Sequence, residues 1–402
     1  MLGWATNLLI VLASALVHWW LWKRLVRDTT RPGTRARRVG TVLTAASAAL
    51  AAAPRILVPA LGPDAGRWLA WPGYTWLAVL LYLALPLLVA ELIRAAGWLR
   101  SRRAGRNDPG PAVPPTAAEL NRRLFLSRTA GATAGVISVA TTGYGLTSAL
   151  GPPRVQRVPV GISRLDPRLS GLRIAVVSDL HLGTMLGRSH TERIVRHING
   201  LEADVVAVVG DLADGLPAEL GAAARPLRSL ESTHGSFFVT GNHEYLYDGA
   251  DAWVSELHNL GVRGLRNERV EIHHNGATLD LAGVEDVTGE EYGSGPDFAR
   301  TLDGRDPTRP VVLLAHQPIL ATQAARHGVD LQLSGHTHGG QFFPITQLSR
   351  LWEPVVSGLG KVEDTTVYVT NGAGFFGPPV RVGAPPEVTL IELHPAGEDR
   401  SQ

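Results

Sequence analysis

Long apolar stretches occupy the first 150 residues of the chain, whereas shorter apolar runs alternate with polar positions in the rest. A helix needs roughly 20 apolar residues to cross a bilayer whose hydrocarbon core is about 30 Å thick. Three stretches meet this length, and a fourth is less apolar and rich in Gly, Ala and Thr; they cover residues 2–22, 39–61, 74–93 and 124–150. We therefore expect an all-α transmembrane module of three spans over residues 1–108. A secretory signal peptide is the alternative for the first stretch, but its positive charges follow the apolar run instead of preceding it.

The charged residues between these stretches predict how the module is oriented. Seven Lys and Arg residues lie within residues 23–38 and seven within residues 94–123, whereas the loop at 62–73 holds only Arg67. Because basic loops stay on the cytoplasmic side, we expect the two Arg-rich loops in the cytoplasm and the amino terminus outside. A fourth span then places the domain from residue 151 onward outside the cytoplasm. The reverse orientation, with catalysis in the cytoplasm, is the competing hypothesis.

Residues 109–150 are expected to connect this module to the second half of the chain. Pro and Gly concentrate in residues 109–115, which is typical of a linker. The sequence NRRLFLS at residues 121–127 resembles the twin-arginine export motif, although it is internal and not terminal. In the simpler interpretation, Arg122 and Arg123 anchor a helix at the lipid headgroups. Both interpretations predict the same orientation and a fourth apolar segment at 124–150.

From residue 171 the pattern changes to short apolar runs separated by amphipathic segments, which predicts an α/β domain over residues 151–402. Five of the runs are predicted to be buried strands: 172–177, 204–209, 236–240, 311–315 and 330–334. Further strands are expected at 270–273, 278–282, 367–370 and 388–393, and helices at 188–199, 217–231 and 251–260.

A polar cluster ends or follows each of the five buried runs. The clusters are Ser178–His181, Val209–Asp211, Thr240–Glu244, Ala315–Pro318 and Ser334–Gly340. In α/β sheets the loops at the carboxyl ends of the strands converge on one crevice, so we expect the clusters to meet there. Glycines beside the polar residues suit tight turns that bring these loops close together.

The residue types in the clusters suit the hydrolysis of phosphate esters. Two divalent cations about 3.5–4 Å apart lower the pKa of a shared water and neutralise charge on the phosphoryl oxygens. A carboxylate that bridges the cations offsets their mutual repulsion. Asp, His and Asn together suit first-row metals such as Mn, Fe or Zn, because these ions accept both imidazole and carboxylate. Asp-x-His alone is weak evidence and the Gly-Asn-His-Glu and Gly-His-Thr-His strings are each moderately specific, but all five clusters together at strand ends indicate a two-metal site.

The five clusters, in this order, resemble the calcineurin-like metallophosphoesterase superfamily over about residues 170–395. Asn371–Arg381, Pro385–Val388 and Gly339–Gln341 are similar to its membrane-anchored or twin-arginine-exported bacterial branch. The resemblance implies an α/β fold, namely a two-sheet αββα sandwich of mixed sheets flanked by helices. A metal-free relative is the alternative, but every ligand position of the family's motif holds the expected residue.

The resemblance also implies a role for each motif residue. The first ion would be held by Asp179, His181 and His338, and the second by Asn242, His316 and His336, with Asp211 bridging the two. A hydroxide held between the ions would be the nucleophile, so Asp211 also counts as catalytic. His243 would contact the substrate phosphate and protonate the leaving oxygen.

Other polar and apolar residues near the motifs are expected to be structural. We expect Glu244 to support its neighbours through hydrogen bonds, and Asp214 to be a turn residue instead of a partner of the site. The segment Gln341–Pro344, with Leu348, Leu351 and Trp352, is interpreted as a core-packing connection, with an apolar entrance to the site as the alternative. Seven other histidines are expected on the solvated surface: His190, His197, His234, His258, His273, His274 and His327.

Composition limits the remaining function classes. The 402 residues include no Cys, which excludes disulfides, thiolate metal sites and a Cys nucleophile. The net charge of +2 does not favour nucleic-acid binding, and no nucleic-acid partner is expected. Arg outnumbers Lys 36 to 2, which suggests a GC-rich bacterial genome.

These features predict a multi-pass protein of the cell membrane that hydrolyses a phosphomonoester or phosphodiester outside the cytoplasm. We favour Mn for the two ions, and a lipid or envelope-polymer phosphate is one substrate that the location suggests. From another class, the chain could be a membrane sensor whose metallo-domain binds a ligand without turnover. The apolar stretches hold little charge apart from Arg55 and Glu91, which argues against transport.

Overall fold

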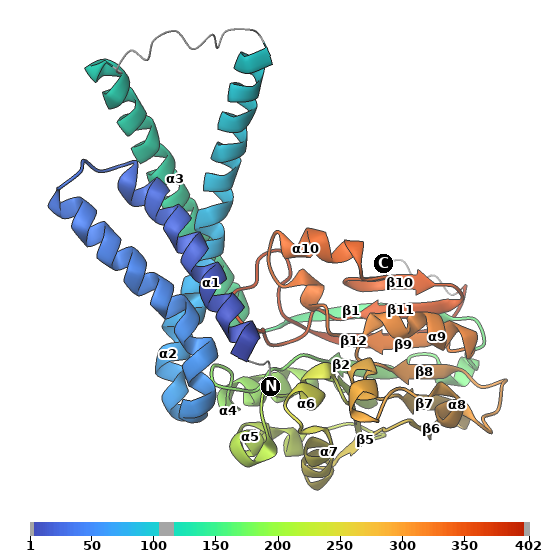
Figure 1. The fold of residues 1–402 in the computed structure, drawn as a ribbon. Coiled ribbons are helices and arrows are strands. Elements are labelled where there is room, and N and C mark those ends of the chain that lie inside the picture. The colour runs from blue at the N-terminus through green and yellow to red at the C-terminus, as the bar shows by residue number, and fades with distance from the viewer. Residues whose placement is uncertain (1–3, 104–115, 398–402) are drawn as a thin grey trace. The chain divides into compact units, whose positions relative to one another are not determined.

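The computed structural model describes residues 4–103 and 116–397 and divides into two compact units (Figure 1). The helical unit takes in the described residues up to 146 together with residues 377–379. The sheet unit takes in residues 147–376 and the described residues from 380 onward. The linker predicted at 109–115 lies outside the described residues.

Three long helices make up most of the helical unit. They are α1 (Trp4–Leu21), which continues into a π-helical segment at Trp22–Arg27, α2 (Arg35–Arg103) and α3 (Ala117–Leu150). The α2 helix is interrupted at Gly62, whose φ of 72° lies outside the helical range, and Pro63 follows. A proline has no N–H to continue the helical ladder, so this pair divides α2 into two parts. The predicted spans at 39–61 and 74–93 lie on either side of the interruption.

Two helical segments, Asn7–Arg27 and Arg35–Arg103, are long and apolar enough to cross a membrane. They overlap the first three predicted spans. The fourth predicted span, at 124–150, is helical in α3, but among the described helices α3 does not reach the same apolarity. Its Gly, Ala, Thr and Ser residues explain the difference. The number of spans and their orientation stay predictions.

Polar side chains inside the helical unit have partners from other helices. The buried His18 ring donates from Nδ1 to the Ser14 carbonyl at 2.8 Å and accepts at Nε2 from the Trp76 indole at 3.0 Å. Arg24 forms an ion pair with Glu91. Because an unpaired polar group is costly in an apolar interior, these contacts stabilise the packing of the first helical segment against the second half of α2.

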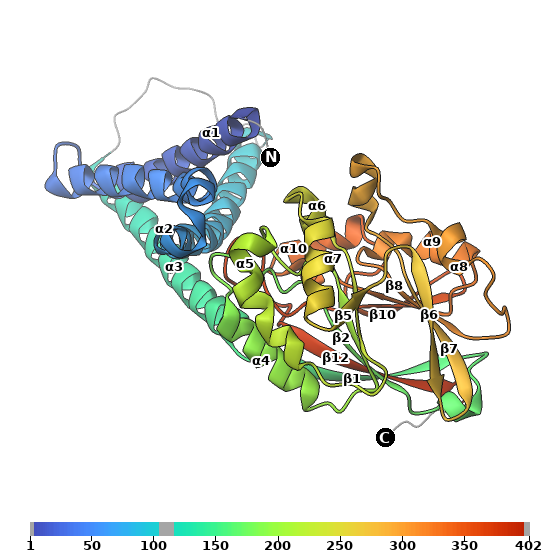
Figure 2. The same ribbon diagram turned by 90° about the horizontal axis from the view of Figure 1, so that it is seen from below.

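Two six-stranded mixed sheets form the sheet unit (Figure 2). The first has the order β1 (Arg154–Ile162), β12 (Glu387–Pro395), β2 (Arg173–Val177), β3 (Val205–Val209), β4 (Ser236–Val239), β5 (Val262–Gly264). The second has the order β10 (Gly358–Val362), β11 (Thr365–Val369), β9 (Leu331–Ser334), β8 (Val311–Leu314), β7 (Ala277–Gly283), β6 (Glu268–His274). Only the pairs β12–β2, β10–β11 and β6–β7 are antiparallel among these described strands.

Helices cover the outer face of each sheet. On the first sheet lie α4 (Arg188–Asn199), α5 (Pro217–Ala224) and α7 (Ala250–Asn259); on the second lie α8 (Phe298–Leu302) and α9 (Ala321–Arg326). Two short helices, α6 (Asn242–Leu246) and α10 (Ile345–Leu348), lie in loops. The unit is therefore the αββα sandwich that the family resemblance implies.

Strand β3 shows why the buried runs are apolar at every position. Val205, Ala207 and Val209 pack between the two sheets, whereas Val206 and Val208 pack against the helices. Successive strand residues point to opposite faces, and both faces of this strand are covered. All five residues are buried, so a polar side chain is first tolerated where the strand ends.

The structure differs from the predicted elements where a strand lacks an apolar run or where a local residue ends or begins a helix. Strands β1, β5 and β10 were not predicted; β1 is an edge strand with mostly exposed side chains, so it lacks an apolar run. The helix predicted at 217–231 ends as an α-helix at Ala224, because Pro226 cannot donate to the helical ladder. Asn242 and His243, predicted in a loop, begin α6 instead.

Candidate metal centre

The five polar clusters meet at the carboxyl ends of strands from both sheets. The first sheet supplies Asp179 and His181 after β2, Asp211 after β3, and Asn242 and His243 after β4. The second sheet supplies His316 after β8, and His336 and His338 after β9. The convergence expected from the topology is therefore present, and it joins two sheets at one site.

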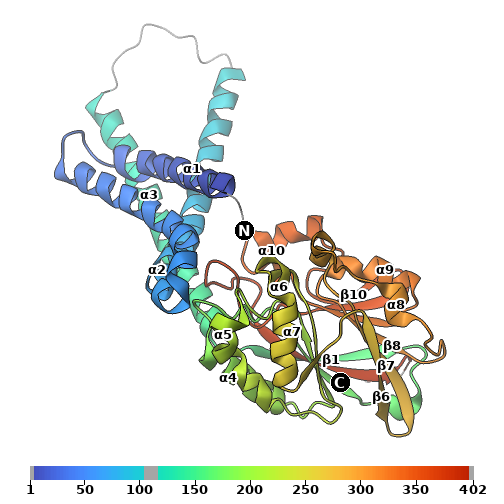
Figure 3. The same ribbon diagram turned by 60° about the horizontal axis from the view of Figure 1, so that its bottom comes forward.

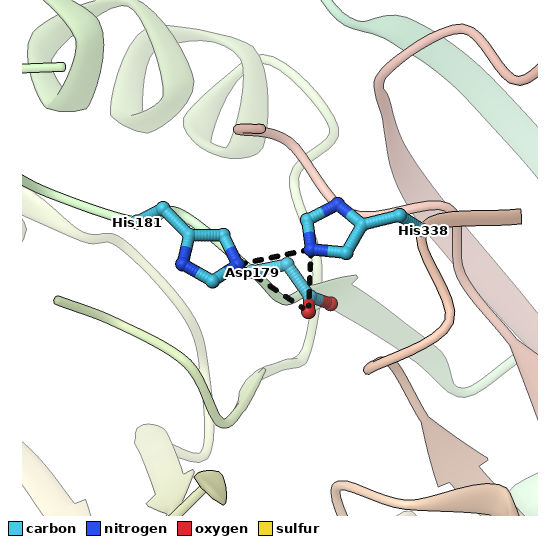
Figure 4. A group of neighbouring side chains, drawn as sticks. All are labelled: Asp179, His181 and His338. Carbon is cyan, nitrogen blue, oxygen red and sulfur yellow. Dashed lines mark hydrogen bonds and ion pairs between the residues drawn. The ribbon is translucent and has the colours of Figure 1, made fainter. Parts of the chain in front are cut away.

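One group of donor atoms consists of Asp179, His181 and His338 (Figure 4). The Nε2 atoms of the two rings lie 2.9 Å apart. Asp179 Oδ1 lies 3.3 Å from Nε2 of His338 and 3.9 Å from Nε2 of His181. All three residues are buried, so their donor atoms face one another and not solvent.

A second group of donor atoms consists of Asp211, Asn242, His316 and His336. Nε2 of His316 lies 3.3 Å from Asp211 Oδ2 and 3.2 Å from Asn242 Oδ1. The same amide oxygen lies 2.8 Å from Nδ1 of His336. Asp211 Oδ2 also lies 3.8 Å from Nε2 of His181 in the first group. The Asp211 carboxylate is thus shared between the two groups.

The two donor sets fit divalent metal ions. Imidazole nitrogens and carboxylate oxygens converge within 4.8 Å of one another in each group, which is the chemistry that first-row ions accept. Burial raises the pKa of Asp211, but the charges of His316 and His243 outweigh it and hold the pKa well below its usual value. Asp211 is therefore an anion suited to bind cations.

The backbone at five of these residues is left-handed although none of them is glycine. Asp179, His181, Asp211, His336 and His338 have φ between 46° and 70°. Such a conformation costs about 1–3 kcal/mol at a non-glycine residue and persists only where the surroundings enforce it. The sheet unit therefore holds these donors in turns that the isolated sequence would disfavour.

Two glycines are required by the close packing of the ligand loops. A Cβ atom at Gly335 would overlap the Ser178 hydroxyl and the Asp179 carboxylate. A Cβ atom at Gly241 would overlap the backbone and carboxylate of Asp211. Larger residues at these two positions would displace the predicted ligands.

Asp214 does more than the turn role that we predicted. Its Oδ1 lies 2.8 Å from Nδ1 of His181 and 2.7 Å from Nδ1 of His243. Burial raises the pKa of Asp214, but the two histidines lower it to about 2. A carboxylate that accepts from the outer nitrogen of a histidine fixes the ring so that the other nitrogen faces the centre. The turn-only interpretation is therefore wrong.

Glu244 supports the site through hydrogen bonds, as predicted. Its buried carboxylate accepts from the backbone N–H of Gly241 at 2.7 Å, of Asp211 at 3.1 Å and of Leu212 at 2.9 Å. Burial and the nearby charge of Asp211 raise the pKa of Glu244 to about 7. The side chain fixes the loop after β3 to the beginning of α6.

His243 lies beside the shared carboxylate and under an exposed aromatic ring. Its Nε2 is 3.9 Å from Asp211 Oδ2, and its ring meets Phe376 edge to face at 4.8 Å between centroids. Burial lowers the pKa of His243, but the Asp211 and Asp214 carboxylates outweigh it and raise the pKa to about 9. The two carboxylates therefore favour the protonated form of His243.

Arg381 is a functional neighbour whose role the sequence did not reveal. It is fully buried and donates to the carbonyls of His338 and Ala384 at 2.9 and 3.4 Å and to that of Gly374 at 3.0 Å. A guanidinium nitrogen also lies 2.9 Å from Nδ1 of His338. Only its place in the carboxyl-terminal motif could have singled it out before the structure.

Two expectations about residues outside the site are wrong. His190, predicted at the surface, is buried because it lies on the face of α4 that packs on the sheet. His258, His273 and His327 are exposed as predicted, and the other three are half-buried: His197, His234 and His274. The segment with Phe343, Leu348, Leu351 and Trp352, interpreted as core packing, exposes these side chains.

Comparison with known proteins supports the resemblance. Residues 172–340 match the family model described as calcineurin-like phosphoesterase. The chain is 35% identical over 404 residues to a Danio rerio protein named "Transmembrane protein with metallophosphoesterase domain", covering 97% of this chain and 88% of the relative. It is 41% identical over 277 residues to a Bos taurus protein of the same name, covering 66% and 62%.

A bacterial relative also matches. The chain is 37% identical over 266 residues to an "Uncharacterized metallophosphoesterase" of Helicobacter pylori, covering 65% of this chain and 70% of the relative. The names of the first two relatives and the two long apolar helical segments indicate a membrane location for this chain.

Proposed function

The chain belongs to the calcineurin-like metallophosphoesterases, which are phosphoric ester hydrolases, and we propose that it cleaves a phosphomonoester or phosphodiester at a two-metal centre. The observation that carries this proposal is the shared carboxylate of Asp211. It lies between two groups of donors, with His181 on one side and His316 on the other. A carboxylate placed between two donor groups would offset the mutual repulsion of two bound cations.

In the proposed centre, Asp179, His181 and His338 would hold one ion. Asn242, His316 and His336 would hold the other, and Asp211 would be shared between them. When bound, the ions supply charge neutralisation for the phosphoryl oxygens and a water whose pKa is lowered, and we favour manganese. The chain's own residues fix the geometry: Asp214 orients His181, and the strand-end turns hold the carboxylates.

His243 has the properties of the proton donor in this reaction. The Asp211 and Asp214 carboxylates favour the protonated ring by raising its pKa, and the hydrogen bond to Asp214 fixes its orientation. A protonated imidazole can donate to the leaving oxygen as the ester bond breaks. A cation bound at Asp211 offsets the charge of that carboxylate and so moves the pKa of His243 back toward its ordinary value.

We propose an extracytoplasmic location for the reaction. The support is the distribution of Arg and Lys, which are dense within residues 23–38 and 94–123 and sparse within 62–73. An even number of spans before residue 151 then places the sheet unit on the side of the amino terminus. A reporter fused after Gln402 that is active only in the cytoplasm would reverse this assignment.

The test uses the full chain, purified in detergent and supplied with Mn, Fe or Zn in turn. We expect about two ions per chain and hydrolysis of an aryl phosphodiester or phosphomonoester. Asp211→Asn should abolish turnover, whereas Asp303→Asn, at an exposed position in the same unit, should leave it unchanged. Two bound ions without turnover on any phosphoester would favour the ligand-binding alternative, and no bound ion would overturn the proposal.

A further inference from the structure

An apolar ridge is exposed just after the last predicted ligand, His338. It consists of Phe343, Ile345, Leu348, Leu351 and Trp352, which are 49%, 38%, 43%, 79% and 58% exposed. The last four are spaced by three or four residues, or are adjacent, along α10 and the 3-10 turn at Ser349–Leu351. Residues at this spacing lie on the same face of a helix. Single exposed apolar residues are common, but five of them within ten residues are typical of an interaction surface.

The polarity of this segment is inverted relative to a helix at a water-facing surface. Thr346 and Ser349 point inward and are buried, whereas the aliphatic and aromatic residues between and after them face outward. Figure 3 shows α10 at the outside of the sheet unit. Such an arrangement is unfavourable in water and favourable where the surroundings are apolar.

The charge of the segment narrows the choice of partner. Residues 341–352 contain Arg350 and no acidic residue. Aromatic residues together with a basic residue suit the interfacial layer of a bilayer, where apolar groups enter the acyl region and the cation meets lipid phosphates. The sheet unit is also tethered to a predicted span, because only residues 151–153 separate α3 from β1 and three residues span at most about 11 Å.

We propose that the apolar ridge inserts into the interfacial layer of the membrane that carries this chain. The ridge is fixed to its unit by a hydrogen bond from Phe343 N–H to the Val382 carbonyl at 3.0 Å. Insertion would bury the five apolar side chains and leave Arg350 at the headgroups. The surface is thus a membrane contact of the sheet unit, separate from the spans.

The ridge is also connected to the metal centre. Gln341, two residues before Phe343, bonds through its side chain to both N–H and carbonyl of Phe376, at 3.0 and 2.9 Å. Phe376 is half exposed and its ring covers His243. If the proposed function holds, an inserted ridge brings the loop of Gln341 and Phe376, which contacts the centre, toward the lipid headgroups. The substrate class is then a phosphoester carried by a lipid.

Insertion is tested on the full chain in phospholipid vesicles, with no need for turnover. The chain has no Cys, so Leu351→Cys gives one site for a nitroxide spin label. The matched control is His273→Cys, an exposed position on β6, which is an edge strand of the second sheet. We expect the label at 351 to be relaxed by oxygen and protected from a water-soluble nickel complex, and the label at 273 to show the reverse.

Two results would overturn insertion. One is nickel accessibility at 351 equal to that at 273, which would leave the ridge in water. The other is strong dipolar broadening between labels at 351 on different chains, which would show that a second copy covers the ridge.

The substrate class is tested separately with the double variant Leu351→Glu, Trp352→Glu. Both positions are exposed, so the fold should tolerate the change. We expect at least a tenfold loss of hydrolysis of a phosphoester lipid in vesicles and unchanged hydrolysis of a soluble aryl phosphoester. Equal effects on both substrates would overturn the lipid assignment. No turnover by the unmodified chain on either substrate would count against the proposed function and leave the label result intact.

Discussion

The two sides of the metal centre are built from different chemistry. The strands of the first sheet contribute both predicted carboxylate ligands, Asp179 and Asp211, together with Asn242 and one imidazole, that of His181. The strands of the second sheet contribute only imidazoles, namely those of His316, His336 and His338. The carboxylates among the predicted ligands thus come from one sheet, and all the predicted ligands of the other sheet are imidazoles.

The supporting contacts differ in the same way. On the first side, two further acids hold the site: Glu244 binds the loop after β3, and Asp214 binds two histidines. On the second side, the support for His338 is the buried cation Arg381. We infer that the first sheet sets the charge and the number of ions, whereas the second sets the position of each ion. Substitutions on the two sides should therefore differ in how many ions the chain still binds.

The largest expected effect is on the shared carboxylate. Asp211→Asn removes the anion that both ions need, so we expect both to be lost and turnover to fall by about 10³-fold or more. His336→Asn, on the imidazole side, should release one ion and retain the other. Elemental analysis of the purified chain measures both counts. If Asp211→Asn retained two ions, the inference that the first sheet sets the number of bound ions would be contradicted.

The proton donor gives the next largest effect. His243→Asn should slow hydrolysis of an ester with a poor leaving group by about 10²–10⁴-fold, and much less for a nitrophenyl ester, whose leaving oxygen needs no proton. The raised pKa means that the donor is present at low pH and lost as pH rises. Activity should fall between the ordinary His pKa and about 9.

The comparison of pH profiles separates this role from a purely structural one. His243→Asn should remove the alkaline decrease as well as lowering the rate. A variant that is slow but keeps the decrease, or that slows both esters equally, would show that His243 only supports the fold.

Arg381 should affect stability more than chemistry. Arg381→Met leaves the carbonyls of His338, Gly374 and Ala384 without their donor inside the protein, which we expect to cost about 3 kcal/mol. The thermal unfolding midpoint in detergent should fall accordingly. Arg157→Met, at an exposed position on β1, is the matched control and should leave the midpoint unchanged. A normal midpoint for Arg381→Met would mean that water replaces the lost donor.

Much of the sheet unit could be predicted from sequence because its central strands are covered on both faces. Runs such as Val205–Val209 are apolar at every position, and the first polar residue after them marks the strand end. The polar clusters were therefore placed correctly at one edge of the sandwich. The edge strand β1 escaped prediction because most of its side chains face solvent.

The features that escaped prediction depend on contacts between distant segments. Nothing local distinguishes Asp214 from a turn residue until His181 and His243 are brought to it. The left-handed backbone at five predicted ligands is likewise enforced by packing. Non-glycine residues have a low intrinsic propensity for this conformation, so the sequence does not predict it. The exposure of Leu351 and Trp352 depends on the tertiary structure and cannot be predicted from their hydrophobicity. Domain boundaries and ligand roles stay predictions.

The smallest expected effect tests how the acidic support acts. Asp214→Asn keeps the size of the side chain but removes its charge, so His181 and His243 lose an ionic acceptor at 2.8 and 2.7 Å. Metal affinity at the first group should fall by about 10–100-fold, since a contact to the outer nitrogen of a ligand orients it. The loss should be confined to the ion near Asp179, because His316 takes its outer contact from the Val209 carbonyl instead.

The pKa of His243 should fall as well, which moves the alkaline decrease in activity to lower pH. Titration of each ion with a competing chelator, together with the pH profile, measures both effects. If both ions weaken equally, the two sides are not independent, and Asp214 contributes to the total charge of the centre more than to the orientation of one ring.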